Sequence, residues 1–270
     1  MTPRAIADRS NLVLRLDPEP LVARVAMATS MVRIGMAWLR REVEISRWLA
    51  ERRTLVTRPT TRVAAGPFER AGMVISFWDL EDVVAERAEP EAAGAALGDL
   101  HGALADYDRS ALPEWGAWEE VRLVMDHARR SPLFDASDRT RLERSFEKAS
   151  RIVEGAKARS ASFQAVHGDA HIANVLATPR GAVWTDWEDA FVGPREYDVA
   201  CLRSKADLFG EEREAIDRMT AAYAARCEYD RGLAEDLGYV RNVQVVPWLA
   251  VFAERHPDLV PRMRARFAKL

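Results

Sequence analysis

The chain has 270 residues, of which 48% are hydrophobic and 30% charged, and its formal net charge is −3. This composition is ordinary for a globular protein with a sizeable buried core, and the charge argues against a general nucleic-acid binder. There is no apolar run long enough to span a membrane, no signal-peptide segment and no metal-binding spacing of the two cysteines, so we expect a cytoplasmic protein without membrane or nucleic-acid partners.

The first 80 residues predict a small lobe that is rich in strands. Apolar runs separated by turn residues such as Asp-Pro-Glu-Pro indicate strands, and apolar residues at helical spacing indicate one helix. The expected order is strand, strand, helix, strand, strand, over 11–16, 21–26, 36–53, 61–65 and 73–78.

The remaining residues predict a larger, mainly helical lobe. Helical periodicity begins near residue 89 and continues to the end of the chain, apart from one segment with short apolar runs. Helices are expected over 92–107, 118–131, 136–158, 197–209, 211–227, 231–254 (interrupted at Pro247) and 261–270. The two parts predict an α+β fold with lobes at 1–80 and 81–270.

The segment between residues 166 and 200 contains the most specific pattern. Asp169 is followed by Asn174 five residues later and by Asp186 twelve residues after that. Phosphoryl transfer from a metal-bound nucleotide needs these residue types, because one carboxylate must accept the proton of the attacking hydroxyl. An amide and a second carboxylate must hold the metal ions that bridge the phosphates.

A predicted hairpin brings these side chains together. The apolar runs 175–177 and 182–184 flank Thr-Pro-Arg-Gly, which suits a tight turn. The pairing places Asn174 opposite Thr185 or Asp186 at the open end of the hairpin. Two oxygen ligands side by side fit a hard cation such as Mg²⁺, and Asp169 lies in the loop that enters the first strand.

These residues resemble the aminoglycoside phosphotransferase family, which has a bilobal, protein-kinase-like fold. The resemblance is carried by HGDAHIAN (167–174), TDWEDA (185–190) and GPREYDVA (193–200). It implies that residues 1–80 form the nucleotide-binding lobe and that residues 81–270 form the catalytic and substrate-binding lobe. The implied roles are catalytic base for Asp169, metal ligands for Asn174 and Asp186, anchor of the catalytic loop for Asp198, and brace of that loop for His167.

The resemblance also places nucleotide contacts in the first lobe. The family's strand lysine, which contacts the α- and β-phosphates, is replaced here by Arg24. Glu42 lies on the apolar stripe of the next helix, and a buried carboxylate needs a cation, so we expect it to pair with Arg24.

The loop that covers the phosphates and the connector that binds the base are harder to place. The phosphate loop has no glycine near Ser10 and Asn11, which are expected to bind phosphates through their side chains and local turn N–H groups. The connector at 77–80 is expected to bind the nucleotide base through its backbone, with Trp78 either a platform for the ring or a core residue, and Leu80 at its end.

We therefore expect an enzyme that transfers the γ-phosphoryl group of ATP or GTP to a hydroxyl of a small molecule, with Mg²⁺ as cofactor. The acceptor is expected to bind to C-terminal helices within 105–165 and 205–270. An antibiotic such as an aminoglycoside is the first candidate, because the resemblance is to a family whose best-known members inactivate aminoglycosides. Residues 81–270 carry 26 basic and 34 acidic side chains, an acidity that suits a cationic acceptor but is mild for a polycationic one. A metabolic amino alcohol or sugar, or a nucleotide-binding regulatory protein without turnover, are the alternatives.

Overall fold

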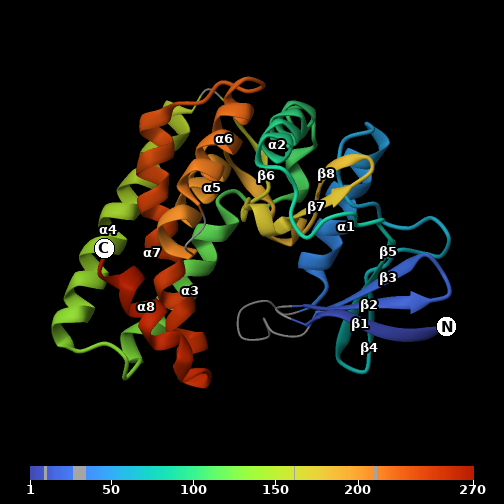
Figure 1. Ribbon diagram of the computed structural model, residues 1–270. Coiled ribbons are helices and arrows are strands. Elements are labelled where there is room, and N and C mark those ends of the chain that lie inside the picture. The colour runs from blue at the N-terminus through green and yellow to red at the C-terminus, as the bar shows by residue number, and fades with distance from the viewer. Residues whose placement is uncertain (9–10, 27–34, 161, 210–211) are drawn as a thin grey trace.

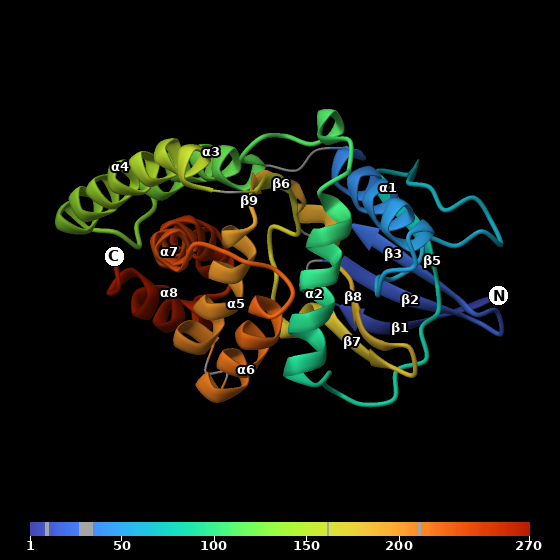
Figure 2. The same cartoon turned by 90° about the horizontal axis from the view of Figure 1, so that it is seen from above.

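The computed structural model describes residues 1–8, 11–26, 35–160, 162–209 and 212–270. Figures 1 and 2 show an antiparallel sheet with one helix at one end of the molecule and a larger group of helices at the other. This arrangement confirms the predicted α+β class.

Five strands form the N-terminal sheet in the order β1-β2-β3-β5-β4, and all neighbours are antiparallel. Their bounds are Thr2–Asp8 (β1), Asn11–Asp17 (β2), Leu21–Ala26 (β3), Phe68–Arg70 (β4) and Met73–Asp79 (β5). The strands predicted at 11–16, 21–26 and 73–78 are confirmed. Strand β1 was not predicted, because it is an edge strand whose residues are all exposed and so lack apolar alternation.

The prediction of a strand at 61–65 is wrong. These residues are irregular, and the short strand β4 begins only after Gly66-Pro67. Gly66 has a φ of +87° and Pro67 has no backbone N–H, so the chain cannot continue a ladder through this pair. Within residues 61–65, only the carbonyl of Ala65 is hydrogen-bonded to β5, and it accepts the N–H of Phe77 at 2.8 Å.

Helix α1 (Ala37–Glu51) buries one face against the sheet and the hairpin region. Its buried residues are Leu39, Glu42, Val43, Ile45, Ser46 and Leu49. The only carboxylate in this set is that of Glu42, which is 1% exposed. The structure thus confirms the predicted buried position of Glu42 and requires a partner for its charge.

The C-terminal part contains seven of the helices in the described residues. They are α2 (Pro90–Leu104), α3 (Gly116–Arg130), α4 (Ala136–Arg159), α5 (Glu196–Phe209), α6 (Arg213–Ala224), α7 (Arg231–Arg255) and α8 (Val260–Phe267). The interruption predicted at Pro247 is wrong, because α7 runs continuously through it. A proline removes only one helical hydrogen bond, and buried Val243, Val246 and Ala250 hold the helix on both sides of it.

Two short antiparallel pairs carry the motif segment. Strand β6 (Phe163–Val166) pairs with β9 (Phe191–Pro194), and β7 (Val175–Thr178) pairs with β8 (Gly181–Trp184). The second pair is the predicted hairpin, with Val175 opposite Trp184 and Thr178 opposite Gly181. The pair β6–β9 was not predicted.

A single hydrophobic core fills the helical part and reaches the first part through Ile45, Leu49 and Val56. The hairpin is tied to the segment after α1, because the N–H of Thr57 donates to the carbonyl of Trp184 at 3.0 Å. Figure 2 shows the hairpin and α2 between the sheet and the other helices. Among the helices of the described residues, none is long and apolar enough to cross a bilayer.

Candidate active site

The loop that carries Asp169 follows β6 and is fixed by the first turn of α5. Asp198, which is fully buried, accepts the backbone N–H of His167 at 2.7 Å and that of Gly168 at 2.9 Å. Gly168 has a φ of +85°, and a Cβ there would lie 2.2 Å from the carbonyl oxygen of Asp189. Only glycine fits this position, and Asp198 makes the contacts that an anchor of the loop requires.

Asp198 is itself held by a buried histidine. The Nε2 atom of His101 lies 2.8 Å from Oδ2 of Asp198, and its Nδ1 atom lies 2.8 Å from the hydroxyl of Tyr223. Burial lowers the pKa of His101, but the hydrogen bond and charge of Asp198 raise it more, to about 8. Burial raises the pKa of Asp198, but His101 and the loop amides lower it by a larger amount, so the pKa is lowered overall. The loop therefore rests on a hydrogen-bonded pair of titratable side chains inside the core.

His167 fixes the loop against the hairpin. Its Nε2 donates to the carbonyl of Thr185 at 2.9 Å, and its Nδ1 accepts the N–H of Asp169 at 3.3 Å. The ring lies 4.6 Å from the ring of Trp187 and 5.4 Å from that of Trp184, measured between centroids. Both nitrogens are thus directed at protein groups, as a bracing side chain needs.

Both carboxylate oxygens of Asp169 face cationic or donor groups. Oδ1 accepts a hydrogen bond from Nη2 of Arg241 on α7, and Oδ2 lies 3.3 Å from Nε2 of His171. The other guanidinium nitrogen of Arg241, Nη1, lies 3.4 Å from the hydroxyl of Tyr197. The Asp169 side chain is 23% exposed and that of Arg241 13%, so the pair lies at the edge of the buried region.

Asn174 pairs with Thr185 at the open end of the hairpin, one of the two positions predicted for it, and Asp186 follows Thr185 in the chain. The N–H of Thr185 donates to the carbonyl of Asn174 at 3.0 Å. The amide nitrogen of Asn174 donates to the carbonyl of Asp169 at 3.0 Å, which leaves its Oδ1 atom to act as an acceptor or ligand. Asp186 adopts a left-handed backbone conformation with a φ of 69°, which is uncommon for a residue with a side chain and costs free energy.

Arg24 on β3 lies among three carboxylates. Its Nη1 is 2.5 Å from Oε1 of Glu42, and its Nη2 contacts Oδ1 of Asp186 and lies 2.9 Å from Oε2 of Glu188. The pair that the sequence predicted between Arg24 and Glu42 is present. Arg24 also joins the N-terminal sheet to both acidic residues that follow the hairpin.

Burial and Arg24 set the ionisation of this cluster. Burial raises the pKa of Glu42 to about 8, although Arg24 opposes this rise. Burial also raises the pKa of Asp186, but the Arg24 guanidinium outweighs it and lowers the pKa overall. The side-chain oxygens of Asp186, Glu188 and Asn174 are of the kind that a divalent cation such as Mg²⁺ binds beside substrate phosphates.

The chain was compared with models of protein families. A model of the phosphotransferase enzyme family matches residues 4–235. The chain belongs to this family. Membership confirms the resemblance that the motifs indicated and the prediction of a phosphotransferase.

Solved structures with the same fold are kinases of different small molecules. An aminopropanol kinase associated with a microcompartment has a TM-score of 0.75 at 15% identity, covering 99% of this chain and 90% of its own. Amicoumacin kinase in complex with AMP-PNP, Ca²⁺ and its antibiotic has a TM-score of 0.72 at 15% identity, with coverage of 99% and 88%. APH(2")-IIia with GDP and kanamycin has a TM-score of 0.67 at 15% identity, with coverage of 99% and 92%. These likenesses confirm the bilobal kinase-like fold. The search of curated proteins found no match.

The rest of the predicted nucleotide site is only partly brought together in this phosphotransferase. Trp78 is 5% exposed, packs with Val43 and Ala65, and donates its indole N–H to Ser76 at 2.9 Å. Of the two alternatives for this side chain, the structure therefore favours the core residue over the ring platform, because little of the ring is left to contact a base.

The connector after β5 uses its first N–H groups within the protein. The N–H of Leu80 donates to the carbonyl of Pro20 at 2.9 Å, and that of Asp79 to the carbonyl of Arg58 at 2.9 Å. A backbone N–H for the base therefore has to come from beyond Leu80. Ser10, which was expected in the phosphate loop, lies outside the described residues.

Two residues of the site, Arg41 and Arg241, were not predicted from the sequence, and Asn11, which was expected to bind phosphates, contacts a carboxylate here. Asn11 donates from its side-chain amide to Oε2 of Glu188 at 3.1 Å, and Arg41 donates to the carbonyl of Glu188 at 3.1 Å. Arg241 lies 72 residues after Asp169, on a helix without a motif. Glu188 lies in the Asp-Trp-Glu triplet of the motif segment, whereas no sequence signal identified Arg241.

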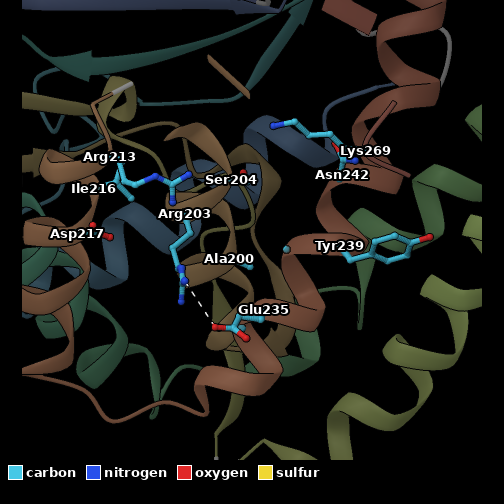
Figure 3. A pocket seen from close by; sticks show the side chains of 12 residues that line it. Ala200, Arg203, Ser204, Arg213, Ile216, Asp217, Glu235, Tyr239, Asn242 and Lys269 are labelled. Carbon is cyan, nitrogen blue, oxygen red and sulfur yellow. Dashed lines mark ion pairs between the residues drawn. The ribbon is translucent and has the colours of Figure 1, made fainter. Parts of the chain in front are cut away.

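The helical part also contains a pocket of about 280 Å³ between α5, α6 and α7 (Figure 3). Basic Arg203, Arg213 and Lys269 and acidic Asp217 and Glu235 share its wall, and Arg203 lies 3.8 Å from Glu235. Asp169 is not among the lining residues, so this pocket does not include the centre of the proposed chemistry.

Proposed function

We propose that the protein is an O-phosphotransferase that moves the γ-phosphoryl group of ATP or GTP to a hydroxyl of a small molecule. The observation that carries the proposal is the joint placement of Asp169, Asn174 and Asp186 around the open end of one hairpin, with Arg24 directed at Asp186. Phosphoryl transfer needs a base, oxygen ligands and a cation for the phosphates in one place, and these residues supply them.

The chain's own residues prepare the nucleotide. Arg24 is fixed by Glu42 and presents a planar guanidinium that can hold phosphate oxygens in bidentate fashion. A divalent ion such as Mg²⁺, held by Asp186 and Oδ1 of Asn174, would neutralise the phosphates. Glu188 keeps Arg24 and Asn11 next to this position.

Asp169 is proposed to act on the acceptor. As the acceptor oxygen bonds to the γ-phosphorus, the hydroxyl proton passes to the Asp169 carboxylate. The bond between the γ-phosphorus and the bridging oxygen breaks, and the nucleoside diphosphate leaves with its electron pair. His167 and Asp198 hold the loop so that this carboxylate stays in line with the transfer.

The nucleotide base is proposed to bind the connector after Leu80. The N–H groups of Phe77, Asp79 and Leu80 all donate to backbone carbonyls, so residues 81–83 are the next donors along the connector. Neighbours of this fold were solved with an ATP analogue and with GDP. Both nucleotides are therefore kept in the proposal.

The acceptor is proposed to be a small alcohol that binds among the C-terminal helices. The sequence ranked an aminoglycoside antibiotic first, and structural neighbours include kinases of antibiotics and of aminopropanol. The charges next to Asp169 change this ranking of acceptors. An ammonium group placed there meets the guanidinium of Arg241, so we now rank an acceptor without a cluster of ammonium groups first and an aminoglycoside second.

An acceptor screen tests the proposal. The protein is incubated with Mg²⁺, γ-labelled ATP or GTP, and a panel of antibiotics, amino alcohols, sugars and hydroxy acids, beside the Asp169→Asn variant as a blank. We expect label in at least one acceptor with the wild type and none above background with the variant. An exposed aspartate on α2, Asp99, supplies the control Asp99→Asn, which should behave as the wild type.

The same experiment separates the enzyme from a regulatory nucleotide-binding protein. Such a protein would gain thermal stability with Mg·ATP but show neither transfer nor slow hydrolysis above the Asp169→Asn blank. That combination would overturn the proposed activity and leave the fold and the nucleotide site intact.

A further inference from the structure

One oxygen of the proposed base is occupied by a guanidinium. Oδ1 of Asp169 is bound by Nη2 of Arg241, and Oδ2 lies 3.3 Å from Nε2 of His171. A carboxylate oxygen that already accepts from a guanidinium is a poor acceptor for the proton of an incoming hydroxyl. Productive binding therefore requires a group that draws Arg241 away from Asp169.

Arg241 is placed to make such an exchange. The contact of its Nη1 with the hydroxyl of Tyr197, which in turn bonds to Gln244, holds one edge of the guanidinium. The other edge is directed at Asp169. A planar guanidinium held in this way can bind an oxyanion of the acceptor with the nitrogen that now contacts Asp169.

More positive charge surrounds this point from helix α8. Arg266 is 2% exposed. Burial lowers its pKa to about 9, and the positive charges of Arg241 and Arg262 lower it in the same direction. The guanidinium groups of Arg241 and Arg262 thus act on Arg266 near Asp169, whose carboxylate opposes them, and a further anion would add to this compensation.

The structure assigns to the acceptor an oxyanion group, a carboxylate or a phosphate, next to the hydroxyl that is phosphorylated, and assigns its recognition to Arg241. This inference rests on the proposed role of Asp169 and narrows it to a substrate class. The oxyanion takes over Nη2 of Arg241, and Oδ1 of Asp169 then accepts the hydroxyl proton. A cationic acceptor cannot do this, because it repels Arg241 instead of binding it.

Four sugars that share one ring test the preference for charge. Glucose, glucosamine, glucuronate and glucose 6-phosphate are titrated into the protein in the presence of Mg·ADP. A charge-assisted hydrogen bond contributes about 1.5–3 kcal/mol, so we expect glucuronate or glucose 6-phosphate to bind at least about tenfold more tightly than glucose, and glucosamine more weakly. The tighter of the two anions distinguishes a carboxylate from a phosphate.

Variants of α7 test whether Arg241 causes the preference for anionic sugars. Arg241→Gln should remove the difference between charged and neutral sugars, and Arg241→Lys should keep part of it. The matched control is Arg231→Gln, an exposed arginine in the first turn of the same helix, which should keep the full difference. Equal or tighter binding of glucosamine by the wild type, or an unchanged ranking in Arg241→Gln, would overturn the inference.

A second measurement does not depend on the shape of the acceptor. Slow hydrolysis of Mg·ATP is measured without acceptor while acetate or inorganic phosphate is added. The wild-type rate should rise several-fold, whereas Arg241→Gln should start from a higher rate and show no response. If neither acetate nor phosphate changes the hydrolysis rate, the result contradicts the inference about the acceptor but not the proposed function. A wild type that neither hydrolyses nor transfers phosphate contradicts the proposed function instead.

Discussion

The two ends of the site arrange their charges differently. At the nucleotide end, one guanidinium, that of Arg24, contacts the carboxylates of Glu42, Asp186 and Glu188. At the acceptor end, the carboxylate of Asp169 contacts the guanidinium of Arg241 and lies 3.3 Å from Nε2 of His171. Carboxylates gathered around one guanidinium suit a metal ion with its phosphates, and a guanidinium that contacts the base suits an anionic acceptor. The site thus separates two negatively charged substrates by the charges that each end presents.

The largest expected effect tests whether Asp169 belongs to the acceptor end alone. We expect Asp169→Asn to lower turnover by about 10²–10⁴-fold, the usual contribution of a general base. Affinity for Mg·nucleotide should stay within about twofold, because Arg24 is held by Glu42, Asp186 and Glu188. Steady-state kinetics and nucleotide titration measure the two values. Near-wild-type turnover would remove Asp169 from its role.

The next prediction concerns the support that both ends share. Asp198→Ala leaves two loop amides and His101 without their buried partner. Removing one member of a buried ion pair costs about 3–5 kcal/mol, and we expect a loss of this size in the free energy of unfolding. Urea denaturation measures it, with the exposed control Asp217→Ala expected to change little. Equal stability of the two variants would show that the loop does not depend on Asp198.

The motif region could be predicted because its contacts are local. Asp169, Asn174 and Asp186 fall within one loop and one hairpin, and the register of a hairpin follows from its turn. Glu42 could be predicted because a carboxylate on a buried helical stripe must find a cation. These rules need only short spacings.

The acceptor end could not be predicted in the same way. Arg241 reaches Asp169 only because α7 packs against α5, and no spacing in the sequence encodes that packing. The edge strand β1 was missed for a related reason, since its pairing with β2 leaves no apolar pattern. Long-range packing decided both features.

The pH dependence of stability tests whether His101 is charged beneath the loop. The pKa of His101 is raised from 6.5 to about 8 in the folded protein. Its contribution to stability is therefore complete below about pH 6.5 and lost as the pH rises through 8, with a total of about 2 kcal/mol. We expect the free energy of unfolding to fall more between pH 6.5 and 8.5 in the wild type than in His101→Gln. Parallel curves would show a neutral His101.

The smallest expected effect tests how the nucleotide end shares its cation. Because Arg24 retains Asp186 and Glu188 when Glu42 is neutralised, Glu42→Gln should raise the nucleotide KM only a few-fold. Arg24→Lys should weaken nucleotide binding by about tenfold, since an ammonium group cannot replace a fork that spans three carboxylates.

The double variant measures whether the two side chains act together. Contacting residues usually show coupling of about 0.5–3 kcal/mol, so the combined loss should be smaller than the sum of the single losses. Nucleotide titration of all four proteins gives this value. The double variant is the most informative of the four proteins, because strictly additive losses would mean that Glu42 does not position Arg24. The acidity at this end would then serve the metal ion alone, and the contrast with the acceptor end would rest on Asp186 and Glu188.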